Sequence, residues 1–316
     1  MVGYVILALL LGLVAVWLLT AAGYFRALLV RPNAKRKQSD GALAGPLADF
    51  IADNNAAAEQ IEALGIAQKL QMRAVDGTLL RARLLPAKEK SNKYALCVHG
   101  YKSSGLGDFG AIGLQLWQQG YNVLLVDDRA HGESGGKYIG MGVLDSDDVL
   151  AWCQYLVLQK GRDTEIVLHG MSMGAATVLM AAAKPSLPVQ VKGVVADCGF
   201  SDGPRLIPVL VNMKAKGAVQ RLLLRTVNGF AKFFAGYSLY DARPLAHVSN
   251  IHIPVLFIHG AADDYVPAEM VHELYAACKA PKRLYIAEGA WHACSFVVNK
   301  AAYTAQLNAF YSEISF

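Results

Sequence analysis

Short apolar runs rich in β-branched residues alternate with helical patterns through most of this chain, and this alternation limits the possible folds more than any other feature. Eight runs predict strands, at 69–75, 79–85, 94–99, 122–127, 165–169, 191–196, 255–259 and 283–286. From the third run onward helical patterns separate them, at 109–119, 143–160, 172–183, 268–278 and 299–311. Continuous apolar strands joined by amphipathic helices are typical of a mostly parallel sheet with helices on both faces. We therefore expect one α/β domain over residues 67–316.

The interval 201–250 interrupts this alternation, because it holds helical patterns but no strand. An insertion between two strands of a parallel sheet lies above the strand ends, so this interval predicts a small helical cap. Its apolar residues are mixed with lysines and arginines. We expect it chiefly to cover a site at the strand ends, and in a membrane-attached protein it could also contact anionic lipid.

The first 25 residues contain no charged side chain. This stretch exceeds the roughly 20 apolar residues that span a bilayer, so we predict a single transmembrane helix within residues 1–30. A cleaved signal peptide is the alternative, with Thr20-Ala21-Ala22 as the cleavage site. Against it, the segment lacks basic residues at its start and its apolar run exceeds the usual length of roughly 7 to 15 residues.

Positive charge is concentrated directly after the apolar stretch. No acidic residue precedes Asp40, whereas five basic residues do: Arg26, Arg31, Lys35, Arg36 and Lys37. The positive-inside rule therefore predicts that the rest of the chain is cytoplasmic. The remaining basic and acidic residues cancel, so the basic surface of a nucleic-acid-binding protein is not expected.

Residues 31–66 predict a tether and a helical lead-in. The segment 31–45 has the charged, Pro- and Gly-containing composition of a solvated linker. The segment 47–64 has helical spacing, and leaves open whether that helix lies on the membrane surface or packs on the domain. The five cysteines are odd in number and form no CxxC pair, which favours reduced thiols in the cytoplasm over disulfides or a zinc site.

A GxSxG motif follows the fifth predicted strand and opens a predicted helix. Its serine is Ser172, and its glycines are Gly170 and Gly174. This strand–turn–helix setting is that of a nucleophile elbow, in which the serine lies in a strained turn and larger neighbours would collide with the strand and the helix. Ser172 is therefore the candidate nucleophile.

A serine nucleophile needs a base and an acid that orients the base, and in this architecture both follow it at later strand ends. The segment 259–267 ends one predicted strand and contains Asp263 and Asp264, and His292 follows the next strand. His272 also follows these aspartates, but it falls inside a predicted helix. We therefore expect His292 to be the base and one of the two aspartates to be the acid.

Four segments together resemble the α/β-hydrolase superfamily, and more narrowly its serine aminopeptidase and monoacylglycerol lipase-like branch. They are the turn Val98-His99-Gly100-Tyr101, the elbow, the DxRxHGxS-like segment Asp128-Arg129-Ala130-His131-Gly132-Glu133-Ser134, and the HGxxDxxVP-like segment 259–267. The resemblance runs from about residue 69 to the C-terminus and implies the α/β-hydrolase fold. It implies that the acid is Asp263, with Asp264 in reserve. It also implies an oxyanion hole formed by the backbone N–H groups of Tyr101 and Met173.

Other motifs have structural interpretations. His99 and His131 are expected to fix loops by hydrogen bonding, and Arg129 is expected to be solvated or ion-paired. The segment 105–110 is a literal GxGxxG, and Asp127 follows at a spacing that imitates a dinucleotide site. However, residues 99–104 lengthen the loop after the strand, so the first glycine cannot form the tight turn that such a site requires.

These features predict a serine hydrolase that is anchored to the cell membrane and needs no cofactor or metal. We expect it to cleave an ester or thioester of a small acyl substrate through an acyl-enzyme. A serine peptidase with the same triad is the alternative. A catalytically silent binding module is a further hypothesis, which the presence of serine, aspartate and histidine disfavours.

Overall fold

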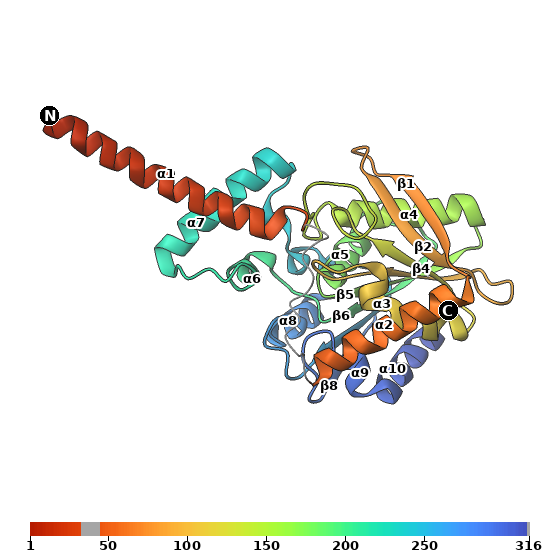
Figure 1. Ribbon diagram of the computed structural model, residues 1–316. Coiled ribbons are helices and arrows are strands. Elements are labelled where there is room, and N and C mark those ends of the chain that lie inside the picture. The colour runs from red at the N-terminus through yellow and green to blue at the C-terminus, as the bar shows by residue number, and fades with distance from the viewer. Residues whose placement is uncertain (33–44, 315–316) are drawn as a thin grey trace.

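An eight-stranded sheet forms the centre of the computed structural model, which describes residues 1–32 and 45–314 (Figure 1). The strands are β1 (Gln68–Arg73), β2 (Leu79–Leu85), β3 (Lys93–Val98), β4 (Asn122–Asp127), β5 (Glu165–Met171), β6 (Val191–Asp197), β7 (Val255–Gly260) and β8 (Lys282–Ala287). Their order is β1-β2-β4-β3-β5-β6-β7-β8. Strand β2 pairs antiparallel with β1 and β4, and the other pairs are parallel. The predicted eight-stranded, mostly parallel sheet is confirmed.

Helices cover both faces of this sheet (Figure 1). One face packs against α4 (Asp145–Lys160), α5 (Met173–Ala182) and α8 (Glu269–Ala277). The other packs against α2 (Pro46–Leu64), α3 (Gly105–Gln118), α9 (Ser295–Val298) and α10 (Lys300–Glu313). Successive side chains of a strand point to opposite faces, so Leu96 of β3 enters the first core and Cys97 the second. This double burial explains why the strands read as continuous apolar runs.

Helix α2 packs on the domain, which decides between the two positions that its sequence left open. Phe50 and Ile61 are buried in the core beneath it. The buried Asn54 accepts a hydrogen bond from the N–H of Ala111 in α3. A Cβ at Gly110 would lie 2.7 Å from the Asn54 carbonyl, so glycine is what allows the two helices to approach so closely. The predicted tether falls mostly on residues 33–44, outside the described ranges.

The interval between β6 and β7 contains helices and turns. Its elements are α6 (Gly203–Leu210), α7 (Gly217–Phe230), the π-helical turn η1 (Ala231–Ala235) and the 3₁₀ turns η2 (Leu239–Asp241), η3 (Pro244–Ala246) and η4 (Val248–Asn250). Within the described residues this interval holds no strand. That these elements act as a cap over residues 201–250 stays a prediction.

Helix α1 (Val2–Leu29) projects from the body and crosses α7 (Figure 1). It is the one helix of the described residues that is long and apolar enough to span a membrane, with a mean hydropathy of 2.7 in its most apolar window. Trp17 donates its indole N–H to the Thr226 hydroxyl at 3.0 Å. Phe25, Leu28 and Leu29 are buried against the rest of the chain. No pattern in the sequence indicated that the last turns of α1 pack against the rest of the chain.

Candidate active site

Ser172 lies in the sharp turn between β5 and α5. Its backbone has φ +55° and ψ −115°, a conformation that non-glycine residues rarely adopt and that surrounding structure must impose. The Ser172 N–H donates to the carbonyl of Asp197 at the end of β6, at 2.8 Å. The neighbouring strand thus holds the turn from one side, and the half-buried hydroxyl stands at the carboxyl ends of the parallel strands.

The two glycines of the GxSxG motif are required by close backbone contacts. A Cβ at Gly170 would lie 2.3 Å from the carbonyl oxygen of Gly174. A Cβ at Gly174 would lie 1.9 Å from the carbonyl oxygen of Val98 in β3. Real side chains do not tolerate such distances, so these positions let α5 start directly against the sheet.

The structure brings the three predicted triad residues together. His292 Nε2 lies 2.8 Å from Ser172 Oγ, and His292 Nδ1 lies 2.7 Å from Oδ2 of Asp263. Asp263 follows β7 and His292 follows β8. Because β7 and β8 are parallel, the loops that leave them meet at the same edge of the sheet as the elbow.

The Asp263 carboxylate is buried and held by several donors. Its Oδ1 accepts the N–H groups of Tyr265 and Val266, and its Oδ2 lies 3.3 Å from His259 Nε2. Burial alone would raise the pKa of Asp263, but the contacts with His259, with His292 and with the Val266 N–H outweigh it and lower this pKa to about 2. The acid is therefore ionised at neutral pH.

Sequence reasoning assigned no functional role to His259, which contacts the Asp263 carboxylate. His259 is fully buried and its Nε2 also donates to the carbonyl of Val266 at 2.8 Å. Its place at the end of β7, four residues before Asp263, was the available signal. The reserve acid, Asp264, instead accepts the indole N–H of Trp291.

The loop after β3 carries the first predicted oxyanion donor. The N–H of Gly100 donates to Asp108 Oδ2 at 2.7 Å, and the N–H of Lys102 donates to His131 Nε2 at 3.0 Å. Between them, the N–H of Tyr101 has no acceptor within the described part of the chain, and neither has the N–H of Met173, the first residue of α5. Helix N-termini leave such donors unpaired, and unpaired amides can receive a developing negative charge.

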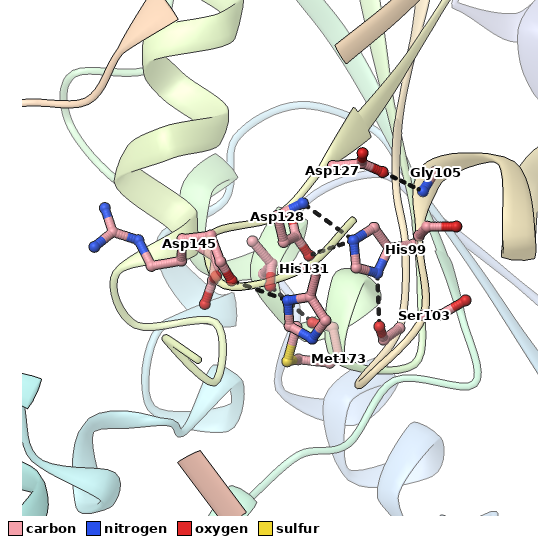
Figure 2. A network of polar contacts seen from close by, with 12 residues as sticks. His99, Ser103, Gly105, Asp127, Asp128, His131, Asp145 and Met173 are labelled. Atoms are coloured by element: carbon pink, nitrogen blue, oxygen red, sulfur yellow. Dashed lines mark hydrogen bonds and ion pairs between the residues drawn. The ribbon is translucent and has the colours of Figure 1, made fainter. Parts of the chain in front are cut away.

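Two histidines fix the loops around this site (Figure 2). His99 Nδ1 donates to the Gly100 carbonyl and its Nε2 accepts the N–H of Asp128. His131 Nδ1 donates to the carbonyl of Arg129. The two rings are in edge contact, with centroids 4.9 Å apart. Burial and the nearby His99 lower the pKa of His131 to about 3, so its Nε2 is a neutral acceptor at physiological pH.

Asp127 is engaged in loop contacts. Its Oδ1 accepts the N–H of Gly105 at 3.0 Å, as Figure 2 shows, and its Oδ2 accepts the N–H of Glu133 at 2.8 Å. In a dinucleotide site the corresponding carboxylate would bind a ribose. Both oxygens already hold the GxGxxG segment and the loop after β4, which is a structural role.

Arg129, which was expected to be solvated or ion-paired, is buried and paired. Its Nε and Nη2 donate to the two carboxylate oxygens of Asp148, both at 2.7 Å, and its Nη1 donates to Asp76 at 2.8 Å. This fork geometry is the strongest form of an arginine–carboxylate pair. It ties the loop after β4 to α4 and to the β1–β2 turn.

A second buried polar group lies behind the elbow. Asp197 accepts the hydroxyl of Tyr303 at 3.0 Å, and the same hydroxyl lies 3.1 Å from His169 Nε2. Burial raises the pKa of Asp197 to about 6, although the Tyr303 hydrogen bond opposes this shift. No sequence motif indicated this group, because its members come from β5, β6 and α10.

The fold and the site define a serine hydrolase of the α/β-hydrolase superfamily. A family model described as the prolyl oligopeptidase family matches residues 109–315, about two thirds of the chain, and this range includes Ser172, Asp263 and His292. The chain belongs to the prolyl oligopeptidase family.

The chain is also similar to two bacterial relatives and to solved structures that share its fold. YqkD of Bacillus subtilis is 35% identical over 195 residues, which are 60% of this chain and 62% of that protein. YfhR of Escherichia coli K12 is 25% identical over 73% of this chain and 75% of its own length. The Pyrococcus furiosus esterase Pf2001 shares the fold with a TM-score of 0.62, at 23% identity over 80% of this chain and 93% of that one. Est1E of Butyrivibrio proteoclasticus, solved with ferulic acid, gives 0.58 at 20% identity over 76% and 98%.

Proposed function

We propose that this chain is a membrane-anchored serine hydrolase that cleaves a carboxylic ester or thioester through an acyl-enzyme. The observation that carries the proposal is the unbroken relay from Ser172 Oγ through His292 to Asp263, with distances of 2.8 and 2.7 Å. A serine hydroxyl is a weak nucleophile, and an adjacent oriented imidazole activates it. Esterases of the same fold support esters as the first substrate class.

In the proposed mechanism, Ser172 Oγ attacks the acyl carbonyl while His292 Nε2 takes the hydroxyl proton. Asp263 holds the Nδ1–H tautomer and stabilises the imidazolium. The N–H groups of Tyr101 and Met173 donate to the oxyanion of the tetrahedral intermediate. His292 returns the proton to the leaving alcohol or thiol. Water then attacks the acyl-enzyme with His292 as its base, which releases the carboxylic acid and restores the serine.

The name of the matched family favours a second candidate, a serine peptidase with the same triad. The relay would serve an amide equally, because His292 would give its proton to a leaving amine instead of an alcohol. Within the α/β-hydrolase superfamily, the motifs resemble the serine aminopeptidase and monoacylglycerol lipase-like branch. That resemblance is compatible with both reactions. Comparison of kcat/KM for matched ester, thioester and aminoacyl-amide substrates separates them, and a preference for the amide would favour the peptidase.

Labelling with a fluorophosphonate probe tests the nucleophile. The full-length chain should react covalently, and Ser172→Ala should abolish the reaction without changing the near-UV circular dichroism. Ser312→Ala is a matched control, since this serine is exposed on α10, and it should label normally. Labelling that persists in Ser172→Ala would reject this assignment.

Membrane attachment is the part of the proposal that α1 supports. Residues 2–20 are exposed and apolar except for the half-buried Trp17 and the hydroxyl of Thr20. At 1.5 Å per residue they extend over about 28 Å, close to the hydrocarbon thickness of a bilayer. The full-length chain should therefore sediment with membranes and resist carbonate extraction. A mature N-terminus near Gly23 would instead favour a cleaved signal peptide.

We further propose a single-pass cell-membrane protein whose hydrolase domain is cytoplasmic. Five basic residues lie at the C-terminal end of the apolar stretch: Arg26 is in the last turn of α1, and Arg31, Lys35, Arg36 and Lys37 follow the helix. Of the five, Lys35, Arg36 and Lys37 lie outside the described residues. The orientation can be tested with a C-terminal fusion to a phosphatase that is active only after export. This fusion should show no phosphatase activity, and strong activity would show that the hydrolase domain lies outside the cytoplasm.

A further inference from the structure

Two consecutive side chains of the loop after β3 hydrogen-bond to backbone carbonyls in the last turn of α1. The hydroxyl of Tyr101 donates to the carbonyl of Leu28 at 2.7 Å, and the ammonium of Lys102 donates to the carbonyl of Ala27 at 2.8 Å. Helix α1 ends at Leu29, so both carbonyls belong to the final turn, whose acceptors have no partner within the helix. The loop thus supplies the C-terminal cap that α1 lacks.

The final turn of α1 is itself fixed to the domain. The carbonyl of Leu29 accepts the N–H of Ile139 at 2.8 Å, and the N–H of Arg31 donates to the carbonyl of Lys137 at 2.9 Å. Leu28 is buried in an apolar cluster that also contains Met173, the residue after the candidate nucleophile. The end of α1 is therefore held in place beside the elbow. Tyr101 and Lys102 hydrogen-bond to this fixed end of the helix.

The backbone of the same loop is held on its other sides by Asp108, which accepts the N–H of Gly100, and by His131, which accepts the N–H of Lys102. Lys102 has φ +60°, a strained conformation that its neighbours must maintain. The side-chain contacts with α1 are the third support. Between these supports lies the N–H of Tyr101, aimed at no acceptor in the described chain.

We propose that the last turn of α1 is a positioning element of the active site, which holds the Tyr101 N–H where the oxyanion forms. This inference rests on the proposed serine-hydrolase function. An oxyanion donor acts only at about 2.7–3.1 Å from the developing charge. A displacement of about 1 Å can cost about 100-fold in rate. Release of the loop from α1 therefore lowers kcat and leaves KM nearly unchanged, because the lost interaction is made in the transition state.

The test uses the full-length chain in detergent with a short, water-soluble ester. Tyr101→Phe keeps the ring and the backbone N–H but removes the hydroxyl, and Lys102→Met removes the ammonium. The double variant should lose roughly tenfold in kcat, with KM changed less than about twofold. Tyr101→Phe alone should show part of this loss, which keeps the test informative if the double variant fails to fold.

Thr226→Val is the matched control. Its hydroxyl accepts the indole N–H of Trp17 at 3.0 Å, so it contacts α1 about three turns before the helix ends at Leu29. This variant removes one contact of α1 but not those of its last turn, and it should leave kcat unchanged. An unchanged kcat in the double variant, or an equal loss of kcat in Thr226→Val, would overturn the positioning role. Esterase activity in Ser172→Ala would instead reject the proposed function, so the two failures are distinguishable.

Discussion

Nδ1 of His292 lies 2.7 Å from Oδ2 of Asp263, whereas the carboxylate of the adjacent Asp264 accepts the indole N–H of Trp291. An orienting carboxylate typically contributes about 10⁴-fold to kcat. Asp263→Asn should therefore reduce kcat by several orders of magnitude. Asp264→Asn, the matched control, should reduce it less than about tenfold. Steady-state ester hydrolysis measures both, and the opposite ranking would transfer the role to Asp264.

The pKa of Asp197, raised by burial to about 6, predicts a pH dependence of stability. The unfolded chain releases this proton near 3.9, so between about pH 4 and 6 the folded state binds more protons. The free energy of unfolding contributed by this group therefore falls as pH rises through that window. Asp197→Asn can still accept the hydroxyl of Tyr303 and does not titrate. Its stability relative to the native chain should rise from pH 4 to 7, by at most about 3 kcal/mol.

Chemical denaturation of the native protein and of Asp197→Asn at several pH values measures the difference between their free energies of unfolding. Other titrating groups cancel in the comparison at each pH. A difference that stays constant between pH 4 and 7 would show that Asp197 does not have a raised pKa in the folded state.

Gly174 predicts a strong effect of a single methyl group. Because its Cβ would lie 1.9 Å from the carbonyl of Val98, Gly174→Ala must displace β3 or α5. We expect a loss of at least about 3 kcal/mol in the free energy of unfolding, with loss of probe labelling. Gly229 in α7 has no atom within 4 Å of its Cβ position, so Gly229→Ala should gain about 0.5–1 kcal/mol. Equal behaviour of the two variants would contradict the contact.

The buried pair between Arg129 and Asp148 predicts non-additive losses. Arg129→Met leaves the Asp148 carboxylate buried without its main partner, which typically costs about 3–5 kcal/mol. The double variant Arg129→Met with Asp148→Leu removes both charges and should recover much of that stability. A double-mutant cycle on thermal or chemical unfolding checks this, and additive single losses would mean that the ion pair is not coupled.

The central strands β3 to β7 were predictable because a sheet covered on both faces buries nearly all of their residues, so local composition is enough to locate them. Helix α3 begins at Gly105, four residues before its predicted start. The predicted range left out residues 105–108, which include two glycines, but Ser104 caps the helix by accepting the N–H of Gly107. Packing of Gly105 against β4 and of Gly110 against α2 outweighs the low helix propensity of glycine.

The candidate triad could be predicted from its motifs, because a strained serine turn needs glycines and strand-end loops carry its partners. The residues that hold the triad and the oxyanion loop in place could not be predicted in this way. His259 contacts Asp263 through a side-chain direction that only the folded loop sets. Tyr101 binds Leu28 from 73 residues away. No short-range pattern encodes such pairings, because they depend on how distant elements meet.

The contact between Trp17 and Thr226 joins residues 209 positions apart, which has a consequence for biosynthesis. At translation rates of about 5–20 residues per second, the ribosome completes α1 about 10–40 s before it reaches α7. During that interval Phe25 and Leu28 must be kept from water by something other than their final neighbours. His292 emerges later still, so a nascent chain carries its N-terminal helix long before it can hydrolyse any substrate.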